Sequence, residues 1–145
     1  PFAERGRQRE LIGAPASTLT GCEYCAGAHA ETARLLGVAA GVLEALVEDV
    51  GPAPVDDKLR PLLAYLLELT VTPVRMVQAD ADAGFAAGWD EDRLHDAIAV
   101  VALFTFMNSL LLGHGVMADE TQFAPRGRRD FKEGYLRQHP ELYGG

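Results

Sequence analysis

Two cysteines and a histidine lie close together near the start of the chain, in the run GCEYCAGAH (residues 21–29). On a helix, residues three and four positions apart are neighbours, so Cys22, Cys25 and His29 would share one face. A helix N-terminus favours a thiolate, which can attack a peroxide to form a sulfenic acid that a second thiol condenses into a disulfide. An imidazole one turn away can hold or pass on the proton. The spacing therefore predicts a redox-active dithiol beside a histidine.

Three other interpretations of this cluster compete with the redox interpretation. The cysteines could be buried structural residues, since cysteine is often buried. A zinc site would need a further ligand, and the other histidines, at positions 95, 114 and 139, show no paired spacing. Haem attachment needs a histidine directly after the second cysteine, where this chain has Ala26.

The surrounding sequence contains many signals for the starts and ends of helices. Strand signals such as alternating polarity and Asn-Gly turns are nearly absent, so we expect an all-α fold of about six or seven helices. Pro15 can kink or end the first helix, and Gly21 leads into the second, which starts at the cysteine pair. The expected helices cover residues 9–19, 22–36, 38–47, 57–70, 72–87 and 91–112, with a further short one near 129–137.

The stretch from Ala97 to Gly113 carries no charged residue. A helix that is apolar on all faces must be covered on all sides, so we expect a buried central helix or a subunit interface, and hence a homo-oligomer. Its 17 residues are at the lower edge for a membrane span, and we interpret it as buried in protein instead. Asn108 within it is expected to be a hydrogen-bonded buried amide.

Composition limits the classes of partner. The 145 residues fit one domain, 1–145, and the net charge of -8 argues against binding to nucleic acid or to anionic membranes. Two cysteines separated by two residues do not make a secreted disulfide scaffold, so we expect a cytoplasmic protein.

The run Arg9-Glu10-Leu11-Ile12, followed by Cys22 twelve residues after the glutamate and then by Cys25 and His29, resembles the AhpD-like alkylhydroperoxidases of the carboxymuconolactone decarboxylase superfamily. The resemblance covers roughly residues 9–118 and leaves a polar C-terminal tail. It implies an AhpD-like helical fold. It also implies a peroxidase that reduces a hydroperoxide substrate, with electrons from a dithiol carrier protein or small thiol and with no cofactor or metal.

Carried over to this chain, the resemblance implies that Cys25 forms the sulfenic acid and Cys22 resolves it. His29 and Glu10 would then relay protons. The helix dipole alone favours Cys22, which is nearer the helix start, whereas the position of His29 favours Cys25, and we assign Cys25. Some members of the family have a histidine between the cysteines, where this chain has Tyr24.

Two alternative functions accompany the peroxidase prediction. A lactone decarboxylase of the same superfamily would not need the cysteine pair. A non-catalytic oligomeric module would use the pair as a structural disulfide or a zinc clip. His114, between two glycines after the apolar helix, is expected at a cap or an interface, and Trp89 is expected to pack in a turn.

Overall fold

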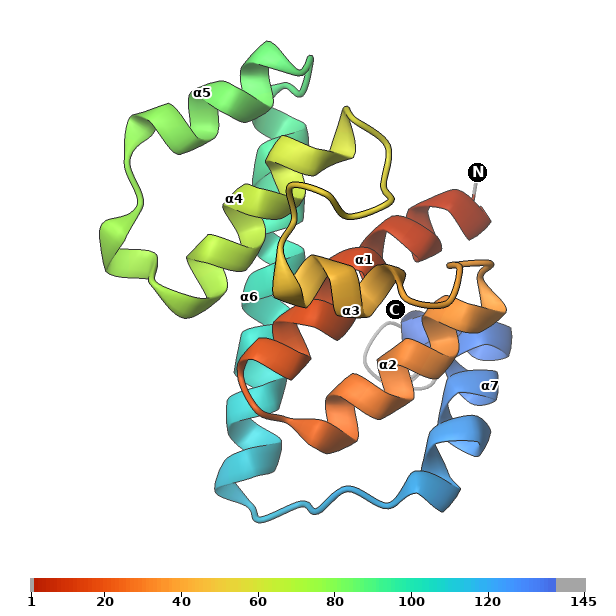
Figure 1. Ribbon diagram of the computed structural model, residues 1–145. Helices are drawn as coiled ribbons and strands as arrows, with labels where there is room; N and C mark the ends of the chain where they lie inside the picture. Colours follow the sequence, from red (N-terminus) through yellow and green to blue (C-terminus); the bar gives the residue numbers. More distant parts are fainter. Residues whose placement is uncertain (1, 138–145) are drawn as a thin grey trace, which may run out of the picture.

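The chain is helical throughout the part that the structure describes. This computed structural model describes residues 2–137, with side chains for residues 5–133, so the end of the predicted polar tail, including His139, lies outside it. The seven α-helices and one 3-10 helix confirm the predicted all-α fold, with the cysteine pair at the start of the second helix. In order they are α1 Phe2–Leu19, α2 Glu23–Leu35, α3 Val42–Glu48, α4 Leu59–Val71, η1 Pro73–Arg75, α5 Gln78–Ala86, α6 Glu91–Gly113 and α7 Glu120–Arg137 (Figure 1).

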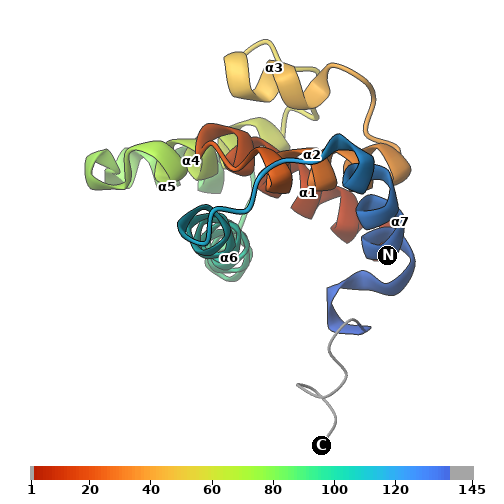
Figure 2. The ribbon, with the colours of Figure 1, turned by 90° about the horizontal axis from the view of Figure 1, so that it is seen from below.

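The helices form layers around α1. In Figure 2, α1, α2, α4 and α5 lie roughly in one layer, with α3 on one side of it and α6 on the other. Helix α1 contacts α2, α3, α4 and α6, and α7 packs on α2. The first helix is therefore the central one.

Small residues explain how α1 can be surrounded. All residues from 10 to 17 are buried, and Gly13, Ala14 and Ala16 leave room for neighbouring helices to approach. Pro15 lies inside α1, and the helix continues through it to Leu19 instead of ending there. Around α1, the core is made of aliphatic residues from α3, α4 and α6, among them Leu46, Leu62, Leu63, Leu66, Leu67, Leu94 and Val101.

Several predicted boundaries were wrong. The helix expected over 72–87 is interrupted: the Thr72-Pro73 start signal gives only the 3-10 turn η1, and α5 begins at Gln78. The last helix begins at Glu120, well before residue 129, and Asp119 accepts hydrogen bonds from Thr121 at this end. The start of α6 is as predicted, since the Asp90 side chain accepts a hydrogen bond from the backbone of its first turn.

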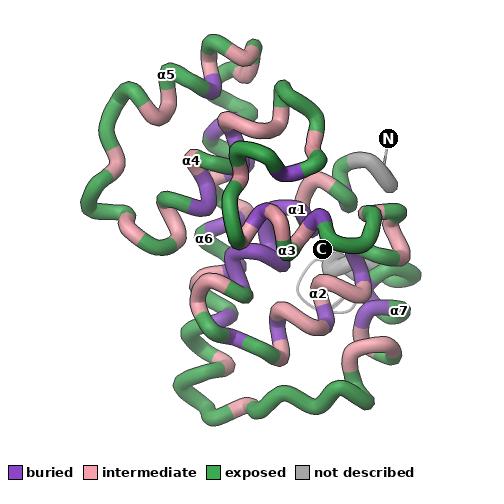
Figure 3. Tube along the Cα trace, viewed as in Figure 1, coloured by how far each residue is buried: buried purple, intermediate pink, exposed green. Residues whose placement is uncertain are grey.

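Of the two places predicted for the apolar helix, a central helix buried on all faces is wrong, and a subunit interface stays a prediction. One face of α6 packs on α1 and α4, whereas large apolar residues on the other faces are exposed, and Figure 3 shows many exposed positions along it. By length and hydropathy α6 meets the criterion for a membrane-spanning helix, which core helices of soluble proteins also meet. The exposed large apolar residues of α6 are Leu103, Phe106, Met107, Leu110 and Leu112.

Candidate active site

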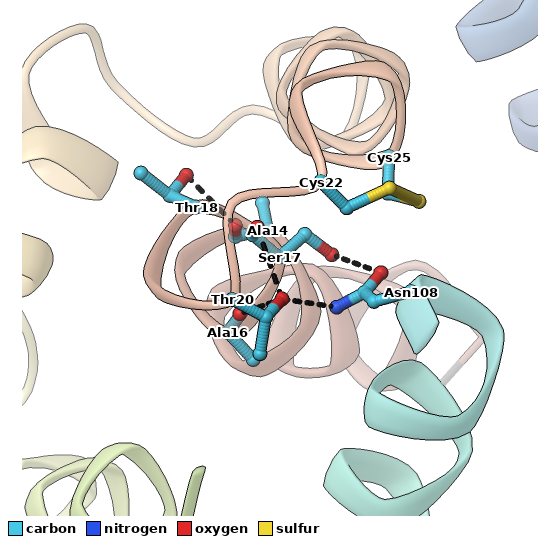
Figure 4. The surroundings of a disulfide bond; sticks show 8 residues. All are labelled: Ala14, Ala16, Ser17, Thr18, Thr20, Cys22, Cys25 and Asn108. Atoms are coloured by element: carbon cyan, nitrogen blue, oxygen red, sulfur yellow. Dashed lines mark hydrogen bonds between the residues drawn. A yellow bond between two sulfur atoms is a disulfide. The ribbon is translucent and has the colours of Figure 1, made fainter. Parts of the chain in front are cut away.

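The cysteine pair lies at the N-terminus of α2. Cys22 is the N-cap residue, Cys25 is in the first turn, and the two form a disulfide with their Cα atoms 5.3 Å apart (Figure 4). Only 1% of Cys22 and 5% of Cys25 is exposed. The structure therefore confirms the predicted juxtaposition of the two sulfurs and shows it in the oxidised state.

The turn between α1 and α2 places Cys22. Gly21 has a φ of 77°, a left-handed conformation that glycine adopts without strain. The Gly21 amide donates to the carbonyl of Thr18, and the Cys22 amide donates to the carbonyl of Ser17, both at 3.0 Å. This is the Schellman arrangement, in which the last carbonyls of a helix are satisfied by the two residues after it. Cys22 therefore completes the C-terminal cap of α1 and is also the N-cap residue of α2.

Buried Glu10 and half-buried His29 form a hydrogen-bonded pair between α1 and α2. Glu10 lies on α1 and is 0% exposed, and its Oε2 lies 2.8 Å from Nδ1 of His29 on α2. A buried carboxylate is stable only when it is paired and hydrogen-bonded. Because His29 follows Cys25 by four residues on one helix, the pair and the dithiol share a face of α2. The structure thus joins Cys22 to Cys25 and Glu10 to His29, with His29 one helical turn beyond Cys25.

Two contacts of this pair were not foreseen from the sequence. Arg9 places its Nε 3.6 Å from Oε1 of Glu10, so the carboxylate has a cationic group on its second oxygen as well. The ring of Phe104, from α6, meets the His29 ring edge-on with centroids 4.6 Å apart. Arg9 is next to Glu10 in the sequence, but neighbours in a helix point in different directions, so no local signal predicts their ion pair.

The comparisons with known proteins agree with this arrangement. The family model described as carboxymuconolactone decarboxylase family matches residues 5–68, a stretch that contains Glu10, Cys22, Cys25 and His29. The chain is therefore similar to the carboxymuconolactone decarboxylase family over this stretch. No curated protein matches the sequence.

Two solved structures share the fold. One is the alkylhydroperoxidase AhpD core of a peroxidase-related protein from Ralstonia eutropha JMP134, with a TM-score of 0.71 and 23% identity. The other is a peroxidase-related protein from Silicibacter sp. TM1040, with a TM-score of 0.70 and 25% identity. Each match covers 84% of this chain, but only 64% and 63% of the respective structures, so this chain spans less than two thirds of their length.

In this chain, α7 covers one side of the cysteine-bearing helix. A Cβ at Gly27 would lie only 2.3 to 2.6 Å from ring atoms of Phe123 on α7, so the missing side chain lets the two helices approach closely. Glu31, one turn further along α2, lies against Gly127 of α7. The side-chain hydrogen bond from Arg34 lowers the pKa of Glu31, which keeps this carboxylate ionised at the helix contact.

The remaining candidate residues lie away from the dithiol. Trp89 packs in its turn, as predicted, and its Nε1 donates to the carbonyl of Lys58 at 2.7 Å. His114 is exposed at the C-cap of α6, consistent with the expected cap position. Among the described residues, no group of three or more histidine, cysteine, aspartate or glutamate side chains is placed to hold a metal ion, so a zinc clip finds no ligand set there.

Proposed function

We propose that the protein is a thiol-dependent peroxidase that reduces hydroperoxides through a cycle between the Cys22–Cys25 dithiol and its disulfide. The observation that supports this most directly is a disulfide at a helix N-terminus on the same helix face as a glutamate–histidine pair. A purely structural disulfide would not require a histidine held by a buried glutamate one helical turn away.

The proposed cycle has three steps. The Cys25 thiolate attacks the terminal oxygen of the hydroperoxide, so that the O–O bond breaks, a sulfenic acid forms, and the alkoxide leaves as an alcohol after taking up a proton. The Cys22 thiol then attacks the Cys25 sulfur, forming the disulfide and releasing water. A dithiol donor, either a carrier protein or a small thiol, finally returns two electrons and two protons.

The glutamate–histidine geometry suggests how the proton is supplied. An ionised Glu10 can only accept hydrogen bonds, so the hydrogen on His29 belongs on Nδ1, where it is donated to the carboxylate. This tautomer makes Nε2 the ring nitrogen that takes up and releases a proton. His29 is therefore proposed as the acid for the departing alkoxide, with Glu10 holding its orientation.

The assignment of Cys25 as the attacking thiol rests on two features. Cys25 is one helical turn from His29, and it is slightly more exposed than Cys22. Cys22, as the N-cap residue, is closer to the unpaired amides of the helix start, which favour a thiolate there as well. Since the helix start favours a thiolate at both cysteines, the attacking and the resolving cysteine are told apart by trapping the sulfenic acid.

The test is peroxide consumption by the protein with a dithiol donor, in the wild type and in matched cysteine variants. We expect C25S to abolish turnover while the helical spectrum is retained. We expect C22S to undergo a single oxidation that leaves a sulfenic acid on Cys25, detectable by mass spectrometry after trapping with a dicarbonyl reagent. E10Q is expected to lower the rate by about 10²-fold or more, the usual scale for a lost proton-transfer partner.

Other outcomes of this experiment would favour the alternatives. Sulfenic acid on Cys22 in C25S, with turnover lost in C22S, would reverse the two cysteine roles. A wild type without peroxide turnover, whose stability falls on mutation of either cysteine, would indicate a structural disulfide. Activity on a lactone that survives in C25S would favour a decarboxylase, the chemistry named by the family model.

We also propose that the protein is a cytoplasmic homo-oligomer whose interface includes the exposed face of α6. Phe106 is 61% exposed and Leu110 is 42% exposed, and large apolar side chains clustered on one surface favour association. Light scattering should find an oligomer for the wild type and a smaller species for F106E. A wild type that is monomeric at high concentration would contradict the proposal.

A further inference from the structure

A polar residue interrupts the buried face of α6. Asn108 is only 1% exposed, and it takes the last position in a stripe spaced by three and four residues. An apolar residue would fill such a position without any need for hydrogen-bond partners, whereas a buried carboxamide is stable only where both its oxygen and its nitrogen are paired. The other buried residues of this stripe are Leu94, Ala97, Val101 and Phe104.

Both ends of the Asn108 carboxamide bond to the end of α1. The hydroxyl of Ser17 donates to Oδ1 of Asn108 at 3.1 Å, and Nδ2 of Asn108 donates to the hydroxyl of Thr20 at 2.8 Å (Figure 4). The Thr20 hydroxyl in turn donates to the carbonyl of Ala16 at 2.9 Å. The Asn108 side chain on α6 therefore completes a hydrogen-bond network with a turn that lies some ninety residues earlier in the chain.

This turn is the one that places the first cysteine. Ser17 contributes its hydroxyl to Asn108 and its carbonyl to the amide of Cys22, so one residue links the amide side chain to the cysteine backbone. Ser17 itself is fully buried. In Figure 4 the Asn108 side chain reaches from α6 toward Ser17 and Thr20, on the side of the turn where the disulfide lies.

We infer that Asn108 is a positioning residue for the dithiol: it braces the turn between α1 and α2 and so keeps Cys22 ready to close the disulfide. In the oxidised protein the S–S bond itself restrains Cys22. In the dithiol form that covalent restraint is absent, and noncovalent contacts alone hold the turn. Thiols that are already positioned lose less conformational freedom on closing, so the brace favours the disulfide.

The measurement is the equilibrium between the protein and dithiothreitol, in which the protein disulfide is reduced as dithiothreitol is oxidised, or the reverse. Samples are quenched with an alkylating reagent, and the dithiol and disulfide forms are counted by mass spectrometry. We expect N108L to shift the equilibrium toward the dithiol by about tenfold, the scale of two lost hydrogen bonds. S17A, which loses only one of them, should shift it in the same direction by about three- to fivefold.

The matched control is T105V, also on α6. The Thr105 hydroxyl donates to the carbonyl of Val101 in its own helix, so this variant loses a hydrogen bond without touching the turn. We expect it to leave the equilibrium unchanged. Because Ser17 acts through the amide, the double variant N108L/S17A should be no further shifted than N108L. If N108L does not fold, the same equilibrium is measured for S17A and T20V instead.

A shift of less than about twofold in the folded variants, or an equal shift in T105V, would overturn the inference. The role of Asn108 in turnover rests on the proposed peroxidase function, but the equilibrium does not. A wild type that consumes no peroxide would contradict the proposed function. The dithiol–disulfide equilibrium would still show whether Asn108 braces the turn.

Discussion

The contact between Gly13 and Phe104 provides a sharp test of the packing around the site. A Cβ added at Gly13 would lie 2.1 to 2.5 Å from three ring atoms of Phe104. Carbon atoms pack at about 3.5–4.0 Å, so the ring would have to move by more than about 1 Å. The same ring meets the His29 imidazole, which means that G13A acts on both the core and the proposed proton donor.

Three effects determine the stability of G13A. Alanine is favoured over glycine inside a helix by about 0.5–1 kcal/mol. Overpacking a buried site costs about 1–3 kcal/mol, and loss of the edge-on aromatic contact costs about 0.5–1.5 kcal/mol more. The two unfavourable effects outweigh the helix preference, so we expect G13A to be less stable than the wild type by about 1–3 kcal/mol.

The matched control is G84A. Gly84 is also a buried glycine in a helix, α5, but an added Cβ there would meet no atom within 4 Å. G84A should therefore stabilise the protein by about 0.5–1 kcal/mol. Urea unfolding followed by circular dichroism measures both variants, and the ring-current shifts of the His29 protons should change in G13A alone.

A double variant separates the clash from other effects. Replacing Phe104 with leucine removes the ring atoms that the new methyl group would meet, so G13A should cost less in the F104L background than in the wild type. If G13A proves as stable as the wild type and leaves the His29 signals in place, the ring does not occupy this contact and the reasoning fails.

Two further predictions concern other parts of the fold. Hydrogen bonds from the Thr121 side chain and backbone lower the pKa of Asp119 below its ordinary 3.8. The stabilisation they give the start of α7 is therefore present above the ordinary pKa and is lost as the pH falls through the lowered pKa of the folded protein. Hydrogen-exchange protection at the start of α7 should fall over this acidic range in the wild type, and D119A should lack this dependence. Arg60 donates from Nη1 to the carbonyl of Ala53 at 2.8 Å and from Nη2 to the carbonyl of Val55 at 3.2 Å. A lysine has no second nitrogen for this pair, so R60K should cost about 1–2 kcal/mol in urea unfolding and speed proteolysis of residues 50–55, whereas R34K, on the exposed surface, should change neither.

Local features of the sequence were sufficient for the helices and for the centre of the site. The capping carboxylate of Asp90 and the left-handed Gly88 mark helix ends through contacts within a few residues. The spacing of Cys22, Cys25 and His29 fixes their common helix face because helix geometry is a local property. The Thr72-Pro73 signal misled because it starts a single 3-10 turn as readily as a full helix.

The place of the apolar helix could not be derived in this way. The sequence shows that α6 is apolar on all faces, but not how many of those faces this chain itself covers. Only the tertiary structure shows that the small residues of α1 take the central position and leave α6 in an outer layer.

The sequence by itself determined the helical fold class, the dithiol at the start of the second helix and the histidine one turn beyond it. Glu10 was named only through the resemblance of this spacing to that of the AhpD-like alkylhydroperoxidases. Only the tertiary structure decided that Glu10 bonds to His29, that Phe104 borders the ring and that Asn108 braces the cysteine turn. These contacts join residues far apart in the chain, so they depend on how whole helices pack, and no local pattern of residue types encodes them.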